Sequence, residues 1–278
     1  MVHLVVDSGC DVCEEIINNE NCTLSFVPLN LQVEDTVYVD DENLDIKKYL
    51  AHMESVAIAV KTSAPSPSLF LEKFKFGDSV FVVTLSSKLS ATYQVAVSAK
   101  DMYIEEYGKK FIHIVDSLSA CMGEGVIALK LSELAKNGLS AQEIFEQINE
   151  YMKNVRTFFI LDKFDNLVKT GRVKPYIAKI ATVLNIKPIC TAENGEIKML
   201  EKSRGFPKAM SRMVEIIKNE VPDIENRVIG ITHIQAYEKA VALKEELFAQ
   251  LRPKDIVIQD GKGIATTYAN RGAVVLAL

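Results

Sequence analysis

The chain has 278 residues, of which 48% are hydrophobic and 25% charged, a composition typical of a water-soluble globular protein with room for two domains. Its formal net charge of −5 leaves little room for a basic face and argues against a nucleic-acid partner. No apolar stretch reaches the roughly 18 residues of a membrane-spanning helix, and the five scattered cysteines fit reduced thiols. We therefore expect a cytoplasmic protein.

Short apolar runs alternate with helical patterns over the first 155 residues. The expected strands are 4–6, 57–60, 80–85 and 111–115. The expected helices are 45–54, two that begin near 66 and 91, one that follows residues 123–125 and runs to 137–138, and one that begins after Ser140 and ends near 153. Residues 24–33 and 37–39 predict an extended, partly hairpin excursion. The alternation of strands and helices predicts an α/β domain over residues 1–155, with a mostly parallel sheet flanked by helices.

The pattern changes at residue 156. Asn194 and Gly195 form a strong hairpin signal between extended segments. Further strands are expected at 157–161, 228–232, 256–258 and 273–278, and helices at 205–219 and 236–251. A hairpin combined with helices predicts a second, smaller α+β domain over residues 156–278.

Two polar loops follow the apolar runs at 57–60 and 80–85. They carry six hydroxyl side chains, Thr62, Ser63, Ser66, Ser86, Ser87 and Ser90. Because ligands bind at the carboxyl ends of parallel strands, we expect both loops to face one pocket. No His or Cys lies in these loops, and no carboxylate lies between Lys61 and Glu72. The loops therefore favour holding an oxyanion by hydrogen bonds over acid–base or nucleophilic chemistry.

Aspartates offer a second interpretation of the same sheet edge. Asp7 and Asp116 each end an expected strand, where they either hold a metal with a phosphate or cap turns by accepting backbone N–H bonds. With Asp11 added as a third ligand, the metal interpretation corresponds to a Mg²⁺-dependent phosphoryl-transfer enzyme.

A small basic cluster lies near the start of the second half. Arg172 follows a glycine and is close to Lys169 and Lys174, in a protein that is acidic as a whole. The cluster is either a solvated surface loop or a site that recognises a phosphate or an acidic partner.

These residues lie in ordered motifs along the whole chain, which closely resembles the DegV family of bacterial fatty-acid-binding proteins. The motifs are Asp7-Ser8 with Asp11, residues 61–66, residues 85–93, Asp116-Ser117, residues 122–125, residues 167–173 and residues 185–189. The resemblance implies an α/β domain packed on a smaller α+β domain, with one long-chain fatty acid between them.

The resemblance also implies roles for single residues. Thr62 and Ser90 would bind the fatty-acid carboxylate, with Ser63 and Ser87 of the same loops beside them, and Arg172 would lie at the rim where a fatty acid kinase engages. Many family members carry a Thr-His-x-Gly-Pro-Gly segment near the C-terminus, whereas residues 266–272 contain no His. Thr267 or Tyr268 is expected to replace that His as a hydroxyl donor.

The expected function is a carrier with no catalytic activity, no cofactor and no metal. It would hold the fatty acid and present its carboxylate to the kinase for acyl-phosphate formation, in phospholipid synthesis, with transient contact to a membrane surface. Each buried methylene contributes about 0.8 kcal/mol, so the tail needs an apolar tunnel, for which Phe158, Phe159 and residues 176–189 are candidates. A lipid-responsive regulatory protein is the other alternative.

Overall fold

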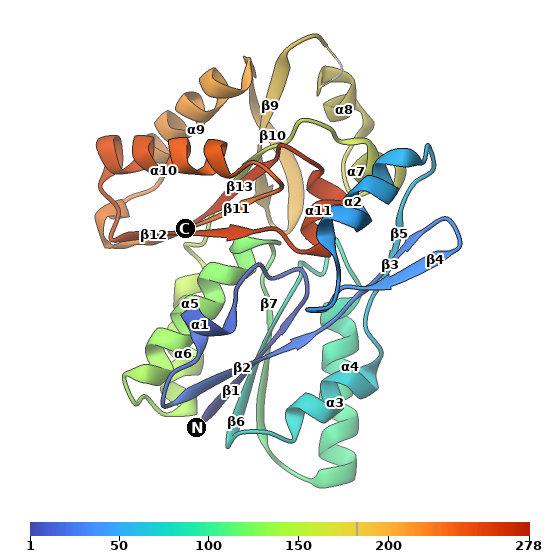
Figure 1. Cartoon of the computed structure of the whole chain (residues 1–278). Helices are drawn as coiled ribbons and strands as arrows, with labels where there is room; N and C mark the ends of the chain where they lie inside the picture. The colour runs from blue at the N-terminus through green and yellow to red at the C-terminus, as the bar shows by residue number, and fades with distance from the viewer. Residues whose placement is uncertain (182) are drawn as a thin grey trace.

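A computed structural model of the chain describes every residue except 182, and the side chain of 178 is likewise outside the description. Three sheets organise the molecule (Figure 1). The first has the order β2-β1-β6-β7 and is parallel throughout, with β1 (Val2–Asp7), β2 (Cys22–Val27), β6 (Ser79–Thr84) and β7 (Phe111–Asp116). Every residue of β1 and β6 is buried, as expected for central strands covered on both faces.

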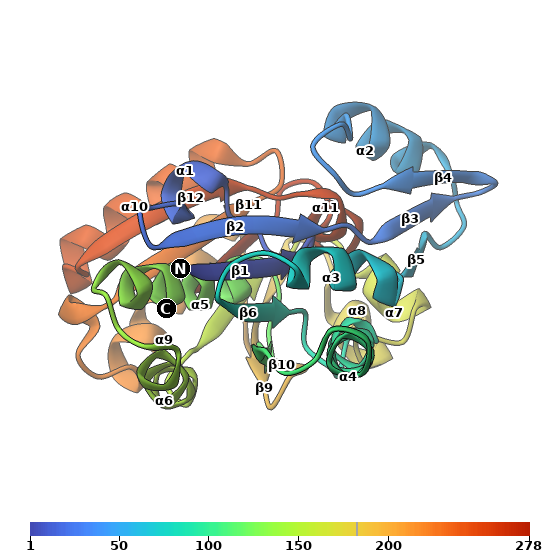
Figure 2. The ribbon, with the colours of Figure 1, turned by 90° about the horizontal axis from the view of Figure 1, so that it is seen from below.

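Helices cover both faces of this parallel sheet. The alternation of side chains along β6 sends Phe81 and Val83 to one face and Val80 and Val82 to the other. The first face packs against α1 (Glu14–Ile17), α5 (Met122–Lys136) and α6 (Ala141–Met152), and the second against α3 (Pro67–Phe74) and α4 (Thr92–Tyr107). Figure 2 shows these layers from below. The predicted α/β architecture is confirmed.

The second sheet has the order β10-β9-β8-β13-β11-β12, in which β11 and β12 are parallel and the other pairs are antiparallel. Its strands are β8 (Thr157–Ile160), β9 (Ile186–Glu193), β10 (Glu196–Arg204), β11 (Val228–His233), β12 (Asp255–Asp260) and β13 (Val274–Ala277). The helices α9 (Phe206–Glu220) and α10 (Tyr237–Leu251), joined through the short 3₁₀ helix η1 (Ile224–Asn226) and β11, pack on one face. A mixed sheet with helices on it matches the predicted α+β half.

The hairpin predicted at Asn194 and Gly195 is confirmed. These residues connect β9 and β10 and have φ values of 52° and 82°, the pair of positive angles that a type I′ turn requires. The chain passes from α6 to β8 across residues 153–156. The division into two domains near residue 155 stays a prediction.

A third, small sheet corrects one expected strand. It has the order β4-β3-β5, with β3 (Asn30–Val33), β4 (Thr36–Val39) and β5 (Lys61–Ser63), and α2 (Ile46–Ser55) packs beside it. Residues 57–60, predicted as a parallel strand, have no strand structure, and β5 is antiparallel to β3. The prediction was wrong because an apolar run alone does not supply a partner strand, and Ile58 in that run is 54% exposed.

Helix α5 connects the two larger sheets. Eleven of its fifteen residues are buried, and it packs against β1 and β6 of the parallel sheet as well as β11 and β13 of the mixed sheet. A helix buried on nearly all sides belongs in the centre of a molecule. Three short helices, α7 (Asp165–Lys169), α8 (Pro175–Ala181) and α11 (Gly263–Ala269), lie on the side of the molecule away from α5 (Figure 1). Among the described residues, no helix is both long and apolar enough to span a bilayer.

Candidate functional site

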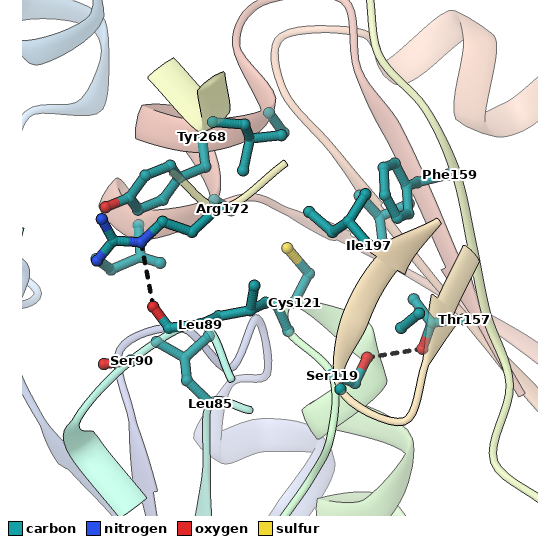
Figure 3. Close-up of a pocket in the computed structure, with 18 of the residues that line it drawn as sticks. Leu85, Leu89, Ser90, Ser119, Cys121, Thr157, Phe159, Arg172, Ile197 and Tyr268 are labelled. Carbon is teal, nitrogen blue, oxygen red and sulfur yellow. Dashed lines mark hydrogen bonds between the residues drawn. The ribbon is translucent and has the colours of Figure 1, made fainter. Parts of the chain in front are cut away.

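A cavity lies where the parallel sheet, the mixed sheet and the short helices meet (Figure 3). It holds about 840 Å³ of space free of protein atoms, including the part that is open to solvent. The side chains come from segments far apart in the chain: loops after β6 and β7, strands β8 and β13, the β9–β10 hairpin, and helices α7 and α11. Its apolar wall consists of Leu29, Leu85, Leu89, Ala120, Cys121, Phe159, Leu161, Leu167, Ala192, Ile197, Ile264, Ala265, Ala269 and Val275.

Polar side chains gather at one end of the cavity. Thr62 on β5 and Tyr268 on α11 share a hydrogen bond of 2.7 Å between their hydroxyl oxygens. The Arg172 guanidinium lies 5.7 Å from the centre of the Tyr268 ring and donates from Nε to the Leu89 carbonyl at 3.2 Å and from Nη1 to the Thr170 carbonyl at 2.8 Å. This end therefore joins a cation and hydroxyl donors from three segments.

Ser90 completes the polar end. It lies just before α4, and its hydroxyl is 2.8 Å from the Thr92 hydroxyl and accepts from the Thr92 backbone N–H at 3.3 Å. A sixteen-residue helix that begins here adds the partial positive charge of its N-terminus. Thr62 and Ser90, predicted to face one pocket, both line this cavity, although β5 is not a strand of the parallel sheet.

A shallow hollow on the surface adjoins the polar end. Leu89, Ser90 and Arg172 line both the cavity and this hollow, which also includes Ser87 and Lys88. A ligand head group at the polar end would therefore lie close to the surface.

The other side chains whose hydroxyls were predicted to bind the carboxylate do not line the cavity, with the exception of Tyr268. Ser63 is exposed on β5, where its hydroxyl accepts from the Asn30 side chain at 3.5 Å, and Ser87 lines the outer hollow. Thr267 is fully buried and donates its only hydroxyl proton to the Gly263 carbonyl at 2.7 Å, so the nearby Tyr49 hydroxyl donates to it. Of the two candidates to replace the missing His, Tyr268 is the one that lines the cavity.

The aspartates at the strand ends bind backbone and side-chain donors. Asp7 accepts from the backbone N–H groups of Gly9 and Leu85, both at 2.8 Å, and Asp116 accepts from those of Ser87 and Leu118 at 3.0 and 3.2 Å. These are the contacts of turn-capping residues.

Asp11 has similar contacts. It accepts from the Lys262 backbone at 2.8 Å and from the Thr232 hydroxyl at 2.9 Å. Burial raises the pKa of Asp7 to about 7 and that of Asp11 to about 6, because desolvation outweighs the hydrogen bonds that each carboxylate accepts. In the part of the chain that the structure describes, no group of three or more His, Cys, Asp or Glu residues is placed to hold a metal ion.

Part of the cavity wall was not predicted from the sequence. Ser119, Thr157 and the hairpin residues Ala192, Gly195 and Ile197 line the cavity, but no local pattern marks them as cavity residues. Phe159 lines it as expected, whereas Phe158 points into the core between the mixed sheet and α9–α10. None of the described residues of 176–189 lines the cavity, and residue 182 of that stretch lies outside the described residues.

An α/β protein that encloses a largely apolar cavity with one polar end has the architecture of a protein that binds small amphipathic molecules. A family model described as "Uncharacterised protein, DegV family" matches residues 1–278. A DegV domain-containing protein of Streptococcus pyogenes serotype M1 is 35% identical over 276 residues, covering 98% of this chain and 97% of the relative. The chain belongs to the DegV family.

Solved structures give the same result. A DegV family protein from Ruminococcus gnavus, refined with vaccenic acid, has 34% identity and a TM-score of 0.93, covering 100% of this chain and 99% of that one. The Streptococcus pneumoniae fatty acid kinase (Fak) B3 protein, loaded with linoleic acid, has 32% identity and a TM-score of 0.94, covering 99% and 98%.

Proposed function

We propose that the protein binds one long-chain fatty acid, with the acyl chain in the apolar cavity and the carboxylate at the polar end. The single observation that carries this proposal is the cavity itself, whose apolar wall ends in a group of hydroxyls beside a guanidinium. The relatives solved with vaccenic acid and with linoleic acid support it.

The chemistry of the polar end suits a carboxylate. A fatty acid is ionised at pH 7, and a desolvated carboxylate without hydrogen-bond donors is costly. Thr62 and Tyr268 have two hydroxyl protons and one mutual bond, so one proton remains for a ligand oxygen. Ser90, Arg172 and the N-terminus of α4 add a further donor and positive charge.

The apolar part supplies most of the affinity. A chain of about 14 methylenes, at about 0.8 kcal/mol each, contributes on the order of 11 kcal/mol before the costs of binding are subtracted. The wall of leucine, isoleucine, alanine and phenylalanine side chains offers few groups that would bind water strongly.

The proposal extends to a partner. The carrier presents the bound carboxylate through the outer hollow to a fatty acid kinase, which forms the acyl phosphate, and Arg172 at the rim contacts that kinase. The Fak B3 relative supports this step. In this proposal the chain itself needs no catalytic residue, metal or cofactor. It acts in the cytoplasm, contacts a membrane surface only transiently, and binds no nucleic acid.

The test is chemical identification of the ligand. The purified protein is denatured and extracted, and the extract is analysed by mass spectrometry for fatty acids at up to one equivalent. Delipidated protein is then titrated with oleate and palmitate. A protein that releases no fatty acid and binds neither would contradict the proposal. Acyl phosphate formed with a fatty acid kinase and ATP, trapped as the hydroxamate, tests the partner.

A further inference from the structure

A hydrogen-bonded pair of hydroxyls lies within the otherwise apolar part of the cavity. Ser119, in the loop after β7, and Thr157, the first residue of β8, have their hydroxyl oxygens 2.7 Å apart. Figure 3 shows this pair on the side of the cavity opposite Arg172 and Tyr268. The pair is therefore separate from the polar end that we assign to the carboxylate.

The backbone makes room for this pair. A Cβ atom at Gly123, near the start of α5, would lie 1.8 Å from the Ser119 Oγ and 2.8 Å from the Thr157 Oγ1. The absence of a side chain at Gly123 thus allows two buried hydroxyls, 3% and 5% exposed as residues, to meet in the wall.

The pair has more hydrogen-bonding capacity than it uses. Two hydroxyls carry two protons, and their mutual bond uses one of them. Within the described part of the chain, the other hydroxyl proton has no acceptor, because no further hydrogen bond joins either side-chain oxygen to another group. A desolvated donor without a partner is costly, so a ligand oxygen at this point would be stabilised.

We propose that the cavity accepts fatty acids that carry a hydroxyl group along the acyl chain, and that Ser119 and Thr157 bind this hydroxyl. The ligand oxygen accepts the remaining proton of the pair and donates its own proton to a lone pair of the other side-chain oxygen. This inference rests on the proposed function and specifies its substrate class.

The hydroxyl pair should make the protein bind a fatty acid with a chain hydroxyl more tightly than the unsubstituted fatty acid. A saturated chain leaves the donor unpaired, whereas a chain hydroxyl at the matching carbon satisfies it, which corresponds to about a five- to tenfold preference. The preference should depend on the position of the hydroxyl, because the carboxylate fixes one end of the chain.

The experiment measures dissociation constants of delipidated protein for stearate and for 3-, 10- and 12-hydroxystearate. Ser119→Ala/Thr157→Val removes both partners together, so that neither is left unpaired, and urea unfolding checks that the variant is folded. We expect at least one of the 10- and 12-isomers to bind five- to tenfold tighter than stearate, and the double variant to lose this ratio. Thr62→Val, at the polar end, should weaken all four ligands and keep the ratio.

Two results would overturn the inference alone: stearate binds but neither mid-chain isomer binds tighter, or the preference survives in the double variant. If no fatty acid of the set binds to the wild-type protein, the proposed function fails together with the inference. The two failures are therefore distinguishable.

Discussion

The side chain of Tyr268 joins the parts of the polar end. Its hydroxyl bonds the Thr62 hydroxyl, and its ring lies beneath the Arg172 guanidinium. A rigid aromatic ring places the hydroxyl at a fixed height above α11 with few rotatable bonds. Tyr268 is therefore the residue whose loss should affect head-group binding while the cavity shape is kept.

Replacement of Tyr268 by phenylalanine removes the hydroxyl and keeps the ring. Each charge-assisted hydrogen bond to a carboxylate is worth about 1.5–3 kcal/mol, so affinity for oleate should fall about ten- to a hundredfold. Isothermal titration with delipidated protein measures the change. Tyr237→Phe, at a side chain that is 63% exposed on α10, is the matched control and should bind oleate normally. Equal affinities of the Tyr268 variant and the wild type would contradict this role.

Helical geometry allows only one of Thr267 and Tyr268 to replace the family's His as a hydroxyl donor, and the sequence does not indicate which one. Neighbouring residues of a helix point about 100° apart, so only one of the two can face the cavity. In α11 the buried position falls to Thr267, which contacts Tyr49 on α2. That choice depends on the packing of α2 and α11, which are more than two hundred residues apart in the chain. Ser119 and Thr157 could not be predicted for a similar reason, because one lies in the loop after β7 and the other on β8 of a different sheet.

At the scale of elements, the sequence predicted those turns and strands that depend on interactions between neighbouring residues. The Asn194-Gly195 turn and most of the apolar strands could be predicted because turn conformation and the pattern of burial depend on neighbouring residues. The strand expected at 57–60 is absent. Most of β2 was expected to belong to an extended excursion, but β2 pairs with β1 at the edge of the parallel sheet. Strand pairing between distant segments is not encoded in either segment alone.

The β9–β10 hairpin closes one side of the cavity, and its tip is fixed by one side chain. The Ser86 hydroxyl donates to the Gly195 carbonyl at 2.8 Å. Ser86→Ala leaves that carbonyl without this donor, at a cost of about 1–3 kcal/mol, and should increase local opening of the hairpin. Hydrogen exchange at residues 192–197 should become about tenfold faster. Ser98→Ala on α4 is the control, and unchanged exchange at the hairpin would argue against this contact.

At the scale of the whole molecule, aspartates of the first half bind backbone groups of the second half. Asp40, just after β4, accepts from the backbone N–H groups of Gly263 and Ile264 at 2.8 and 2.9 Å, and Asp11 accepts from Lys262. These carboxylates hold the start of α11, the helix that carries Tyr268. The contacts thus connect the stability of the interface to the geometry of the polar end.

Asp40→Ala should therefore affect both stability and binding. Two buried N–H groups lose a charged acceptor, and such bonds are worth about 1.5–3 kcal/mol each, so unfolding free energy should fall by about 3 kcal/mol or more. Oleate affinity should also fall, because α11 loses its anchor. Urea unfolding and titration measure the two effects. Asp35→Ala in the exposed β3–β4 turn is the control, and a stable Asp40 variant with normal binding would contradict the argument.

Glu124 on α5 lies at the centre of this interface, near Asp7 and Asp11. The residue is fully buried, and both carboxyl oxygens are without a hydrogen-bond partner among the described residues. Burial, followed by the charges of Asp7 and Asp11, raises the pKa of Glu124 well above 4.5. The folded protein therefore keeps a proton on Glu124 at pH values where the unfolded chain has lost it.

The sign of the pH effect follows from this difference in protons. Above pH 4.5 the folded state binds more protons than the unfolded state, so raising the pH destabilises the fold by up to about 1.4 kcal/mol per pH unit until the folded pKa is reached. Asp7 and Asp11 act in the same direction as Glu124, because burial raises their pKa values to about 7 and about 6. His3 and His113 act in the opposite direction, because burial lowers the pKa of each to about 4 and acid then favours the unfolded chain. The wild-type profile alone thus mixes the two effects.

Glu124→Gln isolates the carboxyl contribution. The amide cannot ionise, so the variant should gain stability relative to the wild type as the pH rises from 5 to 8. Urea unfolding of both proteins at each pH unit gives the difference in stability, in which the effects of the histidines and of Asp7 and Asp11 cancel. Glu225→Gln, at an exposed position of η1, should show a flat difference. A flat difference for Glu124→Gln as well would mean that the buried carboxyl is ionised in the folded protein, and that its burial does not raise its pKa.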